Sequence, residues 1–323
     1  MSVSKRISVI IPCYNCKELI GETLDSLEMQ SYKDFEVICV NDGSTDETLE
    51  YLKKQAETRS LDLKVIDKEN GGVSSARNIG INASDSEYLL FLDADDVYNK
   101  KFIEKLIYNA EGHDTVYCKL DRNLEMVYAV NPDGIEYKKQ SQTEAMQKLL
   151  YEMGSYGFYC YLYKREIIEK IGLRFDENTR HFEDREFNWK YLANCSSILW
   201  LDAPLYGYRI NAESVTQRPA TWHTDGIEAV RRVEKYLNEK NCPYAKEVED
   251  YLFARVLWAA AKNYSISHRK DLFIRLKTEY DLKKYMKRTA KDSSKLVKIA
   301  SILYLINPML FYYAVGSAKK VIK

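Results

Sequence analysis

Short apolar, β-branched runs alternate with amphipathic stretches through the first 130 residues of the chain. The apolar runs predict strands, and they lie at residues 7–11, 35–40, 63–66 and 88–92. The intervening stretches predict helices at residues 17–30, 45–58 and 73–82. Because the strands are nearly continuous in apolar residues, we expect both of their faces to be buried. The alternation therefore predicts an α/β fold with a mostly parallel central sheet and flanking helices.

The pattern changes twice further along the chain. Up to about Arg218 it is mixed, with strand-like runs at 126–130, 197–201 and 206–210 and helical stretches at 143–152 and 185–194. Beyond Pro219 it is almost purely helical, at 227–238, 244–264 and 272–288. We therefore expect an α/β domain over residues 1–218 and a helical C-terminal extension over 219–323.

Composition is that of an ordinary globular protein, but charge is unevenly distributed. The 323 residues are 46% hydrophobic and 30% charged, with a net charge of zero. Residues 283–323 hold ten Lys or Arg and one acid, Asp292, so this tail carries +9 and the remainder −9. A basic tail on an acidic body indicates contact between the tail and an anionic surface.

The tail also contains an uncharged run of twenty residues, 299–318. Asn307-Pro308 in its middle predicts two short helices, with Asn307 as a cap and Pro308 at the first helical position. Three interpretations are open: a buried helix pair, a segment lying in the bilayer interface, and a transmembrane span. The flanking lysines favour the interface, at the inner face of the cell membrane.

Seven cysteines without framework spacing indicate reduced cytosolic thiols, and we expect no secretory signal. Cys13 and Cys16 have the spacing of a redox pair between a strand and a helix. That interpretation leaves the acidic motifs described next unexplained. A zinc site would need a second pair of ligands.

The strongest chemical signal is Asp93-Ala94-Asp95-Asp96 at the end of a buried strand. Ligands of open α/β sheets bind at this edge, and carboxylate oxygens suit Mg²⁺ or Mn²⁺ bridged to phosphates. A solvated acidic turn is the alternative. Three other polar segments also follow strands, so all four can meet in one crevice; they begin at Pro12, Val40 and Asn70.

With these motifs the chain resembles a family-2 glycosyltransferase of the GT-A fold over roughly residues 5–215, of a kind acting in bacterial surface-polysaccharide synthesis. The resemblance implies a nucleotide site that includes Asn15, with the uridine held by Pro12, Tyr14 and Asp42 and its base contacted by Asn70. Arg77 would reach the diphosphate, although a helix-surface salt bridge is the alternative. Asp93 and Asp95 would hold the metal, with Asp95 as the direct ligand.

A Glu-Asp pair, Glu183 and Asp184, begins a predicted helix. The resemblance implies that Asp184 is the catalytic base, which takes the proton of the acceptor hydroxyl, with Glu183 in support. Acids at a helix N-terminus also stabilise the helix dipole without any catalytic role. A last loop, from Tyr208 to Arg218, would bring Arg209 or Arg218 to the departing diphosphate, with His223 as a weaker candidate.

The resemblance therefore implies an inverting hexosyltransferase that moves a sugar from a UDP-sugar to a saccharide hydroxyl with Mn²⁺ or Mg²⁺ as cofactor. The apolar, basic tail favours a lipid-linked acceptor, and no nucleic-acid partner is expected. The alternatives are a sugar nucleotidyltransferase, which would want a Gly-rich loop where Pro12-Cys13-Tyr14-Asn15 stands, and a non-catalytic sugar-binding protein.

Overall fold

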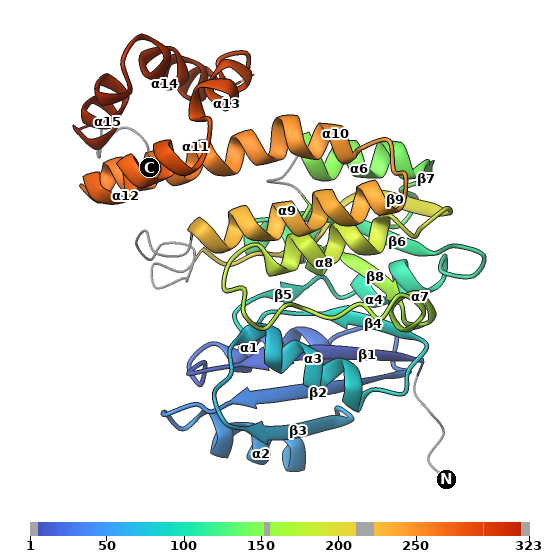
Figure 1. Cartoon of the computed structure of the whole chain (residues 1–323). Coiled ribbons are helices and arrows are strands. Elements are labelled where there is room, and N and C mark those ends of the chain that lie inside the picture. Colours follow the sequence, from blue (N-terminus) through green and yellow to red (C-terminus); the bar gives the residue numbers. More distant parts are fainter. Residues whose placement is uncertain (1–5, 152–155, 211–222, 293, 318–323) are drawn as a thin grey trace. The chain divides into compact units, whose positions relative to one another are not determined.

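The computed structural model describes residues 6–151, 156–210, 223–292 and 294–317. The chain divides into two compact units, Met1–Asn211 and Ala212–Lys323. The first unit is built on a nine-stranded sheet, and the described part of the second is helical (Figure 1). The predicted domain boundary at residue 218 falls in 211–222, outside the described residues.

The sheet has the strand order β3-β2-β1-β4-β8-β6-β9-β5, with β7 paired to β9. Its strands are β1 (Ile7–Cys13), β2 (Phe35–Asp42), β3 (Leu63–Lys68), β4 (Tyr88–Phe91), β5 (Val97–Tyr98), β6 (Thr115–Asp121), β7 (Tyr137–Gln140), β8 (Tyr161–Lys164) and β9 (Ile198–Gly207). The strands β3, β2, β1 and β4 are parallel. The strand β8 runs antiparallel to β4 and β6, and β5 and β7 run antiparallel to β9. The predicted parallel sheet is therefore found in the half built from the first four strands, and the whole sheet is mixed.

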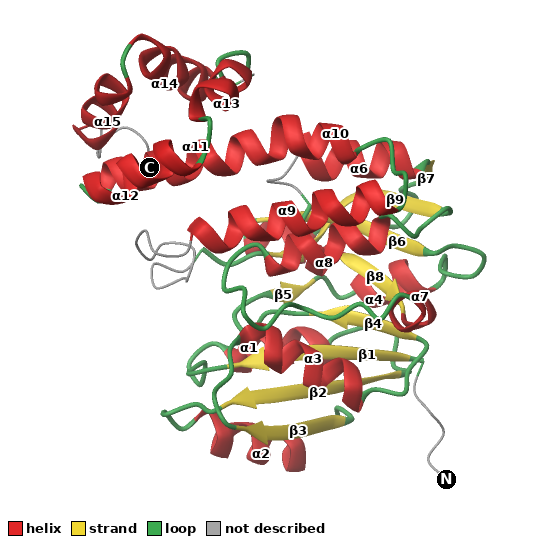
Figure 2. Cartoon of the chain, viewed as in Figure 1, coloured by secondary structure: helices red, strands yellow, loops and turns green. Residues whose placement is uncertain are grey.

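Helices of the first unit connect and flank these strands (Figure 2). They are α1 (Ile20–Glu28), α2 (Thr48–Thr58), α3 (Val73–Ala83), α4 (Phe102–Ile107), α5 (Leu124–Ala129), α6 (Gln142–Tyr151), α7 (Arg165–Lys170) and α8 (Glu183–Leu192). The helices and strands predicted before residue 93 are all present. A strand such as β1, whose apolar residues are fully buried, is the kind of segment that the apolar pattern identifies well.

The prediction of a strand at 126–130 is wrong, because this segment belongs to helix α5. The side chain of Asn123 caps the helix by accepting hydrogen bonds from the backbone N–H groups of Glu125 (3.1 Å) and Met126 (3.4 Å). Only Val127 of the helix is buried, so no alternating face exists to support a strand.

The two strands predicted at 197–201 and 206–210 are one strand, β9. The strand continues through Asp202-Ala203-Pro204, and its pairing with β6 shifts register around Lys119. A proline is tolerated at such an irregularity, where the ladder hydrogen bond is already lost.

The second unit contains α9 (His223–Glu239), α12 (Lys270–Glu279), α13 (Leu282–Thr289), α14 (Lys295–Ile306) and α15 (Pro308–Ser317). A further long helix runs from α10 (Ala245–Glu247) through a π-helical stretch (Val248–Phe253) into α11 (Ala254–Ile266). The single helix predicted at 272–288 is interrupted at Tyr280 and Asp281, where the Asp281 carboxylate accepts from the Lys284 N–H (3.2 Å) and caps α13.

The two short helices predicted around Asn307-Pro308 are confirmed. The Asn307 side chain accepts a hydrogen bond from the Met309 N–H (2.8 Å), and Pro308 is the first residue of α15. In the part of the chain that the structure describes, no helix has both the length and the apolar character needed to cross a bilayer.

Candidate functional site

The ends of β1 and β2 lie side by side, because these strands are parallel neighbours whose arrows point the same way in Figure 2. Asn15, with φ of +47°, sits just beyond β1 and links the two loops. Its side-chain oxygen accepts from the Thr45 N–H (2.8 Å), and its own N–H donates to Ser44 (3.0 Å). Asparagine tolerates this left-handed conformation. Of the neighbouring predicted residues, Pro12 is half-buried at the end of β1 and Tyr14 is exposed.

Asp42, at the end of β2, organises the loop that follows β3. Its carboxylate accepts from the N–H groups of Gly71 and Gly72, both at 2.8 Å, and pairs with Lys68. The Asn70 side chain donates to the Asp42 carbonyl (2.8 Å). Asp42 and Asn70, predicted to share the nucleotide, are thus neighbours.

Gly43 allows these loops to approach closely. It has φ of +64°, and a Cβ at this position would lie 2.6 Å from the backbone nitrogen of Asn70. Any other residue would push the two loops apart.

Three carboxylates, those of Asp93, Asp95 and Asp96, are crowded within four residues after β4. Burial and the charge of Asp93 raise the pKa of Asp95 to about 6. Asp96 is 1% exposed, and burial followed by the charges of Asp93 and Asp95 raises its pKa well above its ordinary value. The Asp96 carboxylate accepts from the hydroxyl of Tyr206 (2.6 Å) and from the N–H of Arg209 (2.8 Å).

Arg77 joins this acidic loop to the Glu-Asp pair. The side chain comes from α3 and is only 3% exposed. Its guanidinium donates to Asp93 (2.8 Å) and to Glu183 (3.1 Å), which is 106 residues away in sequence. The Phe158 and Phe175 rings lie 4.5 and 5.3 Å from the guanidinium carbon. Arg77 is therefore a buried link between two carboxylates, not a helix-surface salt bridge.

The Glu-Asp pair begins α8 after a strained residue. Phe182 has φ of +81°, a conformation that is costly for a bulky side chain and is found mainly at functional sites. Burial and the charge of Asp184 raise the pKa of Glu183 to about 7, while Arg77 acts in the opposite direction. We use the name acidic cluster for Asp93, Asp95, Asp96, Glu183 and Asp184.

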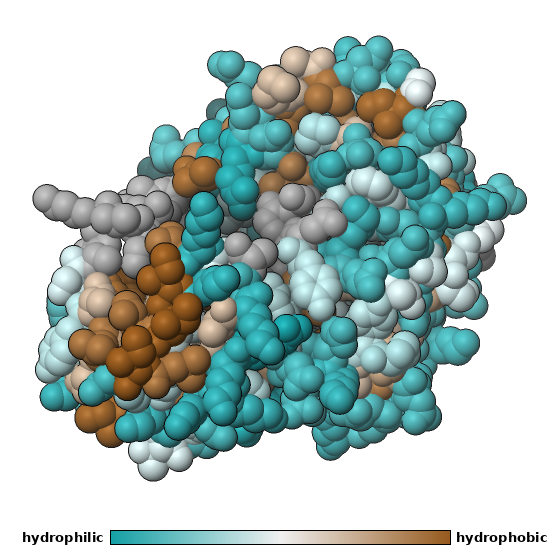
Figure 3. Space-filling view, turned by 90° about the horizontal axis from the view of Figure 1, so that it is seen from above, coloured by the Kyte–Doolittle hydropathy of each residue, from teal (hydrophilic) through white to brown (hydrophobic). Residues whose placement is uncertain are grey.

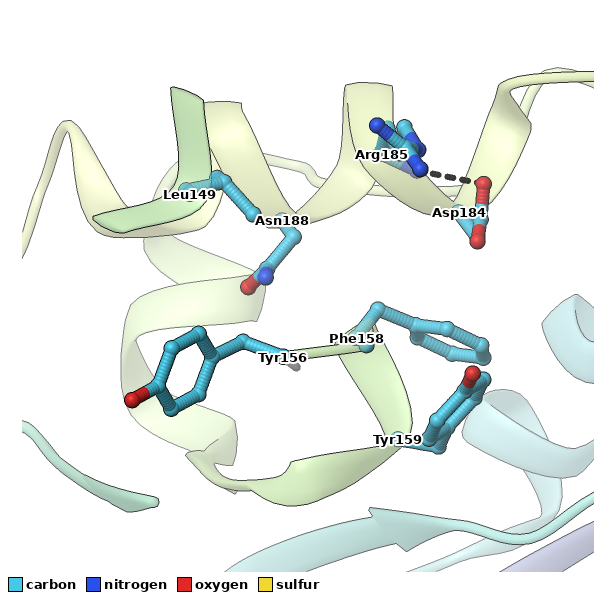
Figure 4. Close-up of a pocket in the computed structure, with 8 residues that line it drawn as sticks. Leu149, Tyr156, Phe158, Tyr159, Asp184, Arg185 and Asn188 are labelled. Atoms are coloured by element: carbon cyan, nitrogen blue, oxygen red, sulfur yellow. Dashed lines mark hydrogen bonds between the residues drawn. The ribbon is translucent and has the colours of Figure 1, made fainter. Parts of the chain in front are cut away.

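Asp184 lines a small cavity of about 60 Å³ (Figure 4). The carboxylate accepts from the N–H of Arg185 (2.7 Å). The other walls combine aromatic side chains, among them Phe158 and Tyr159, with Leu149 and Asn188. Tyr159 stacks on Tyr206 with ring centroids 4.3 Å apart. The candidate base therefore lies beside a cavity that Phe158 and Tyr159 also line. Tyr206, which stacks on Tyr159 and bonds to Asp96, links this cavity to the acidic loop.

Arg209, predicted to reach the departing diphosphate, lies beside the acidic loop. Its Nε donates to the Asp95 carbonyl (2.8 Å), and its guanidinium forms an ion pair with Glu22 of α1. Arg218 lies outside the described residues. His223 is the first residue of α9 in the second unit, and its side chain is also outside the described part.

Sequence reasoning did not identify Asp96, Tyr206 and Tyr159 as parts of the site. Asp96 follows the predicted metal pair directly, so its position was visible, but its partner Tyr206 is 110 residues away. Tyr159 gave no signal among the 26 tyrosines of the chain.

The chemistry of Asp93 and Asp95 fits a hard divalent cation. Both offer carboxylate oxygens, and the like charges that raise the pKa of Asp95 would be offset by a bound cation. The described residues contain no group of three or more His, Cys, Asp or Glu arranged to hold a metal. Two protein carboxylates completed by substrate phosphates are the usual arrangement for Mg²⁺.

The alternative of a redox pair gains no support from the geometry. Cys13 and Cys16 are both free and buried. Hydrogen bonds with the neighbouring thiols Cys16 and Cys39 raise the pKa of Cys13 well above its ordinary value, as does burial. A reactive cysteine needs the opposite, a lowered pKa.

Comparison with known proteins places this geometry in context. The chain is 35% identical over 219 residues to the uncharacterized glycosyltransferase EpsJ of Bacillus subtilis, a match covering 66% of this chain and 63% of that relative's length. Among solved structures, S. aureus TarS 1–349 in complex with UDP-GlcNAc aligns with a TM-score of 0.64 and 21% identity, covering 97% of this chain and 89% of that one. The mannosyltransferase PcManGT from Pyrobaculum calidifontis in complex with GDP-Man and Mn²⁺ aligns with a TM-score of 0.56 and 17% identity, covering 99% and 88%.

The structural likeness confirms the predicted GT-A fold. Residues 8–172, half of the chain, match the family described as Glycosyl transferase family 2. This segment holds four strand-end loops and the Asp93-x-Asp95 pair. The chain therefore belongs to glycosyl transferase family 2.

Proposed function

We propose that this chain transfers a sugar from a UDP-sugar to the hydroxyl of a saccharide acceptor by a metal-dependent, inverting displacement. The observation that carries the proposal is the pair of bonds from Arg77 to Asp93 and Glu183. They bring together the two acidic motifs that such a reaction needs, one for the donor diphosphate and one for the acceptor. The TarS structure with UDP-GlcNAc supports a nucleotide-sugar donor.

On the donor side, the proposal assigns the nucleotide to the loops after β1, β2 and β3. Pro12, Tyr14 and Asn15 line the first loop, and Asp42 and Asn70 hold the other two in register. Asp93 and Asp95 would hold Mn²⁺ or Mg²⁺, which would stabilise negative charge on the leaving diphosphate. Arg77 and Arg209 add fixed positive charge on either side of the pair.

On the acceptor side, Asp184 takes the proton of the attacking hydroxyl. Its carboxylate faces the cavity walled by Phe158 and Tyr159, and aromatic rings of this kind suit the apolar faces of sugars. The bond from Arg77 fixes Glu183, so Glu183 positions its neighbour. A direct attack by the activated hydroxyl on the anomeric carbon inverts its configuration.

We further infer that the acceptor is lipid-linked and that the protein works at the inner face of the cell membrane in surface-polysaccharide synthesis. The basic charge of the tail supports this part of the proposal. The membrane location is independent of the transfer chemistry, so we expect the protein to transfer sugar to a short soluble acceptor as well.

Release of the nucleotide tests the function directly. The protein is incubated with a panel of UDP- and GDP-sugars in Mn²⁺, Mg²⁺ or a chelator, with and without short saccharides. We expect release of UDP from one UDP-sugar, only with metal, and faster with acceptor. Release that the chelator does not change would refute metal dependence. Consumption of UTP with a sugar 1-phosphate would indicate a nucleotidyltransferase, and sugar binding without turnover would indicate a binding protein.

A further inference from the structure

The last two helices expose apolar side chains in an unusual concentration. Fourteen large hydrophobic side chains are exposed in the described part of the chain, and six of them lie within the 18 residues from Leu296 to Tyr313. Their exposed fractions run from 41% to 68%. We call them the apolar stripe: Leu296, Ile299, Ile302, Ile306, Leu310 and Tyr313. In Figure 3, hydrophobic residues gather in a continuous patch on the side where Figure 1 places α14 and α15.

The spacing of the apolar stripe places its members on one side of each helix. Its members recur every three or four residues, which is the repeat of one side of a helix. Leu296, Ile299, Ile302 and Ile306 share one side of α14, and Leu310 and Tyr313 share one side of α15, which begins directly after α14 at Pro308.

The opposite side of these helices is already used for packing. On α14 the buried residues are Val297, Ala300, Ser301 and Tyr304, and on α15 they are Phe311, Tyr312, Val315 and Gly316. Phe311 lies against Phe273 of α12 with ring centroids 6.1 Å apart. The apolar stripe is therefore not the core-facing side of these helices, because other residues of both helices already face the core.

A water-exposed helix ordinarily carries charge on its outer side, and α13 in the same unit does so. It buries Leu282 and Met286, while Lys283 and Lys287 are exposed. Helix α14 has only Lys295 and Lys298, both in its first turn, and α15 has no charged residue. A helix that is apolar on all sides belongs in a larger core or in lipid.

The charges around the apolar stripe identify its occupant. Four exposed lysines lie at its start, and none of them forms a salt bridge within the described residues: Lys287, Lys291, Lys295 and Lys298. Lysines at 319, 320 and 323 follow it in the sequence. An apolar face with lysines at both ends matches the interface of an anionic bilayer. There the lipid acyl chains surround apolar side chains, and the anionic headgroups attract the lysine ammonium groups. A protein partner would have to match the same basic rim with an acidic one.

We propose that the apolar stripe of α14 and α15 is a monotopic docking face that lies in the interface of an anionic lipid bilayer. Each helix is too short to span a bilayer, and Pro308 separates them, so both lie parallel to the membrane plane. The docking face rests on the membrane location inferred under the proposed function and names the surface that makes the contact, but it needs neither donor nor acceptor to bind.

Vesicle binding by the full-length chain tests the docking face. The probes are sedimented vesicles of phosphatidylcholine alone and of phosphatidylcholine with phosphatidylglycerol, at low and high salt. Ile302→Ser/Ile306→Ser removes the middle of the apolar stripe. Its control is Met126→Ser/Ile274→Ser, which removes two side chains of similar exposure (52% and 48%) elsewhere. Equal thermal unfolding of all variants excludes misfolding.

We expect wild type and the control to bind the anionic vesicles, and the stripe variant to bind at least tenfold more weakly. Lys295→Gln/Lys298→Gln should weaken binding about fivefold per lysine at low salt, with Lys53→Gln/Lys54→Gln of α2 as its control. High salt should reduce the lysine effect but not the apolar one.

Equal binding by wild type and the stripe variant would overturn the proposal, as would the absence of binding by wild type. Concentration-dependent dimerisation without lipid, lost in the stripe variant, would identify a second copy as the occupant and also overturn it. UDP release is measured on the same samples. Vesicle binding without UDP release would refute the proposed transfer chemistry alone. Release without vesicle binding would refute the docking face and the membrane location inferred with it, and would leave the transfer chemistry standing.

Discussion

In the first unit carboxylates are crowded and partly or fully buried, and in the second unit apolar side chains are exposed. The acidic cluster holds five acids, two of them bonded to the buried Arg77, at the cost of raised pKa values for Asp95 and Glu183. The apolar stripe leaves six large hydrophobic side chains in water. Both regions reverse the usual distribution of charged and apolar groups between surface and core.

Each reversal is unfavourable in the isolated chain and would be relieved by a different ligand. A divalent cation offsets crowded carboxylates, and a lipid interface removes apolar side chains from water. Violations of ordinary folding rules are expected where a protein binds something. The predictions below test whether the two regions differ in this way.

The largest effect should come from the packed side of the last two helices. Phe311 is fully buried against Phe273 and Tyr304, so Phe311→Ala should lower the free energy of unfolding of the second unit by about 3 to 5 kcal/mol. Ile306→Ala, on the apolar stripe, should change it by less than about 0.5 kcal/mol. Urea unfolding of both variants measures this, and equal losses would show that the apolar stripe is part of the core.

In the acidic cluster, Asp184→Asn should separate binding from chemistry. Transfer should fall by roughly 10²-fold or more, the scale of lost general-base catalysis, while UDP affinity in Mn²⁺ stays unchanged. Steady-state transfer to a soluble saccharide and calorimetry with UDP measure the two quantities. Asp62→Asn, an exposed acid, is the matched control. Normal turnover in the Asp184 variant would move the base to Glu183 or remove the assignment.

Asp95→Asn should weaken metal-dependent UDP binding and, at pH 7 without metal, raise the free energy of unfolding. The folded-state pKa of about 6 lies above the unfolded value, so this group favours the folded state only when protonated. Its contribution is present below about pH 4 and is lost as pH rises to about 6. At pH 7 without metal, the uncharged variant should therefore be about 1 to 3 kcal/mol more stable than wild type.

The same variant should lose the stabilisation that Mn²⁺ with UDP gives wild type, and roughly tenfold or more of its UDP affinity in Mn²⁺. Urea unfolding at pH 7, with and without these ligands, tests both parts. A variant that is less stable without metal, or still stabilised by Mn²⁺ with UDP, would contradict the assignment of Asp95.

The sequence predicts the first four strands and their loops because the relevant signals are local. Apolar runs such as Ile7–Cys13 identify buried strands, and parallel order then brings their ends together. The bond between Arg77 and Glu183 depends on residues 106 positions apart, which no local pattern relates. Segment 126–130 is helical and not the predicted strand, because the cap at Asn123 outweighs the strand preference of its β-branched and aromatic residues.

The apolar stripe shows a different kind of limit. The sequence predicts that both α14 and α15 are apolar, but not which side is packed, because the two sides carry the same kinds of residue. Ala300 and Ile299 are adjacent, yet one is buried and the other is more than half exposed. The packed side of α14 is the one that carries Tyr304, whose ring centroid lies 6.4 Å from that of Phe273, and packing is a property of the folded unit.

The smallest effect should come from Asn307, which joins the two halves of the apolar stripe. Asn307→Ala removes the cap bond from the Met309 N–H and should cost about 1 kcal/mol of stability. Asn123→Ala in the first unit removes a similar cap, from the Glu125 N–H, and should cost about the same. Only the Asn307 variant should also bind anionic vesicles more weakly, because the two helices then no longer hold one continuous face. Urea unfolding compares the two costs, and vesicle sedimentation separates their consequences. Weaker vesicle binding by both variants would trace the loss to general destabilisation, and unchanged binding by both would show that the two halves dock independently.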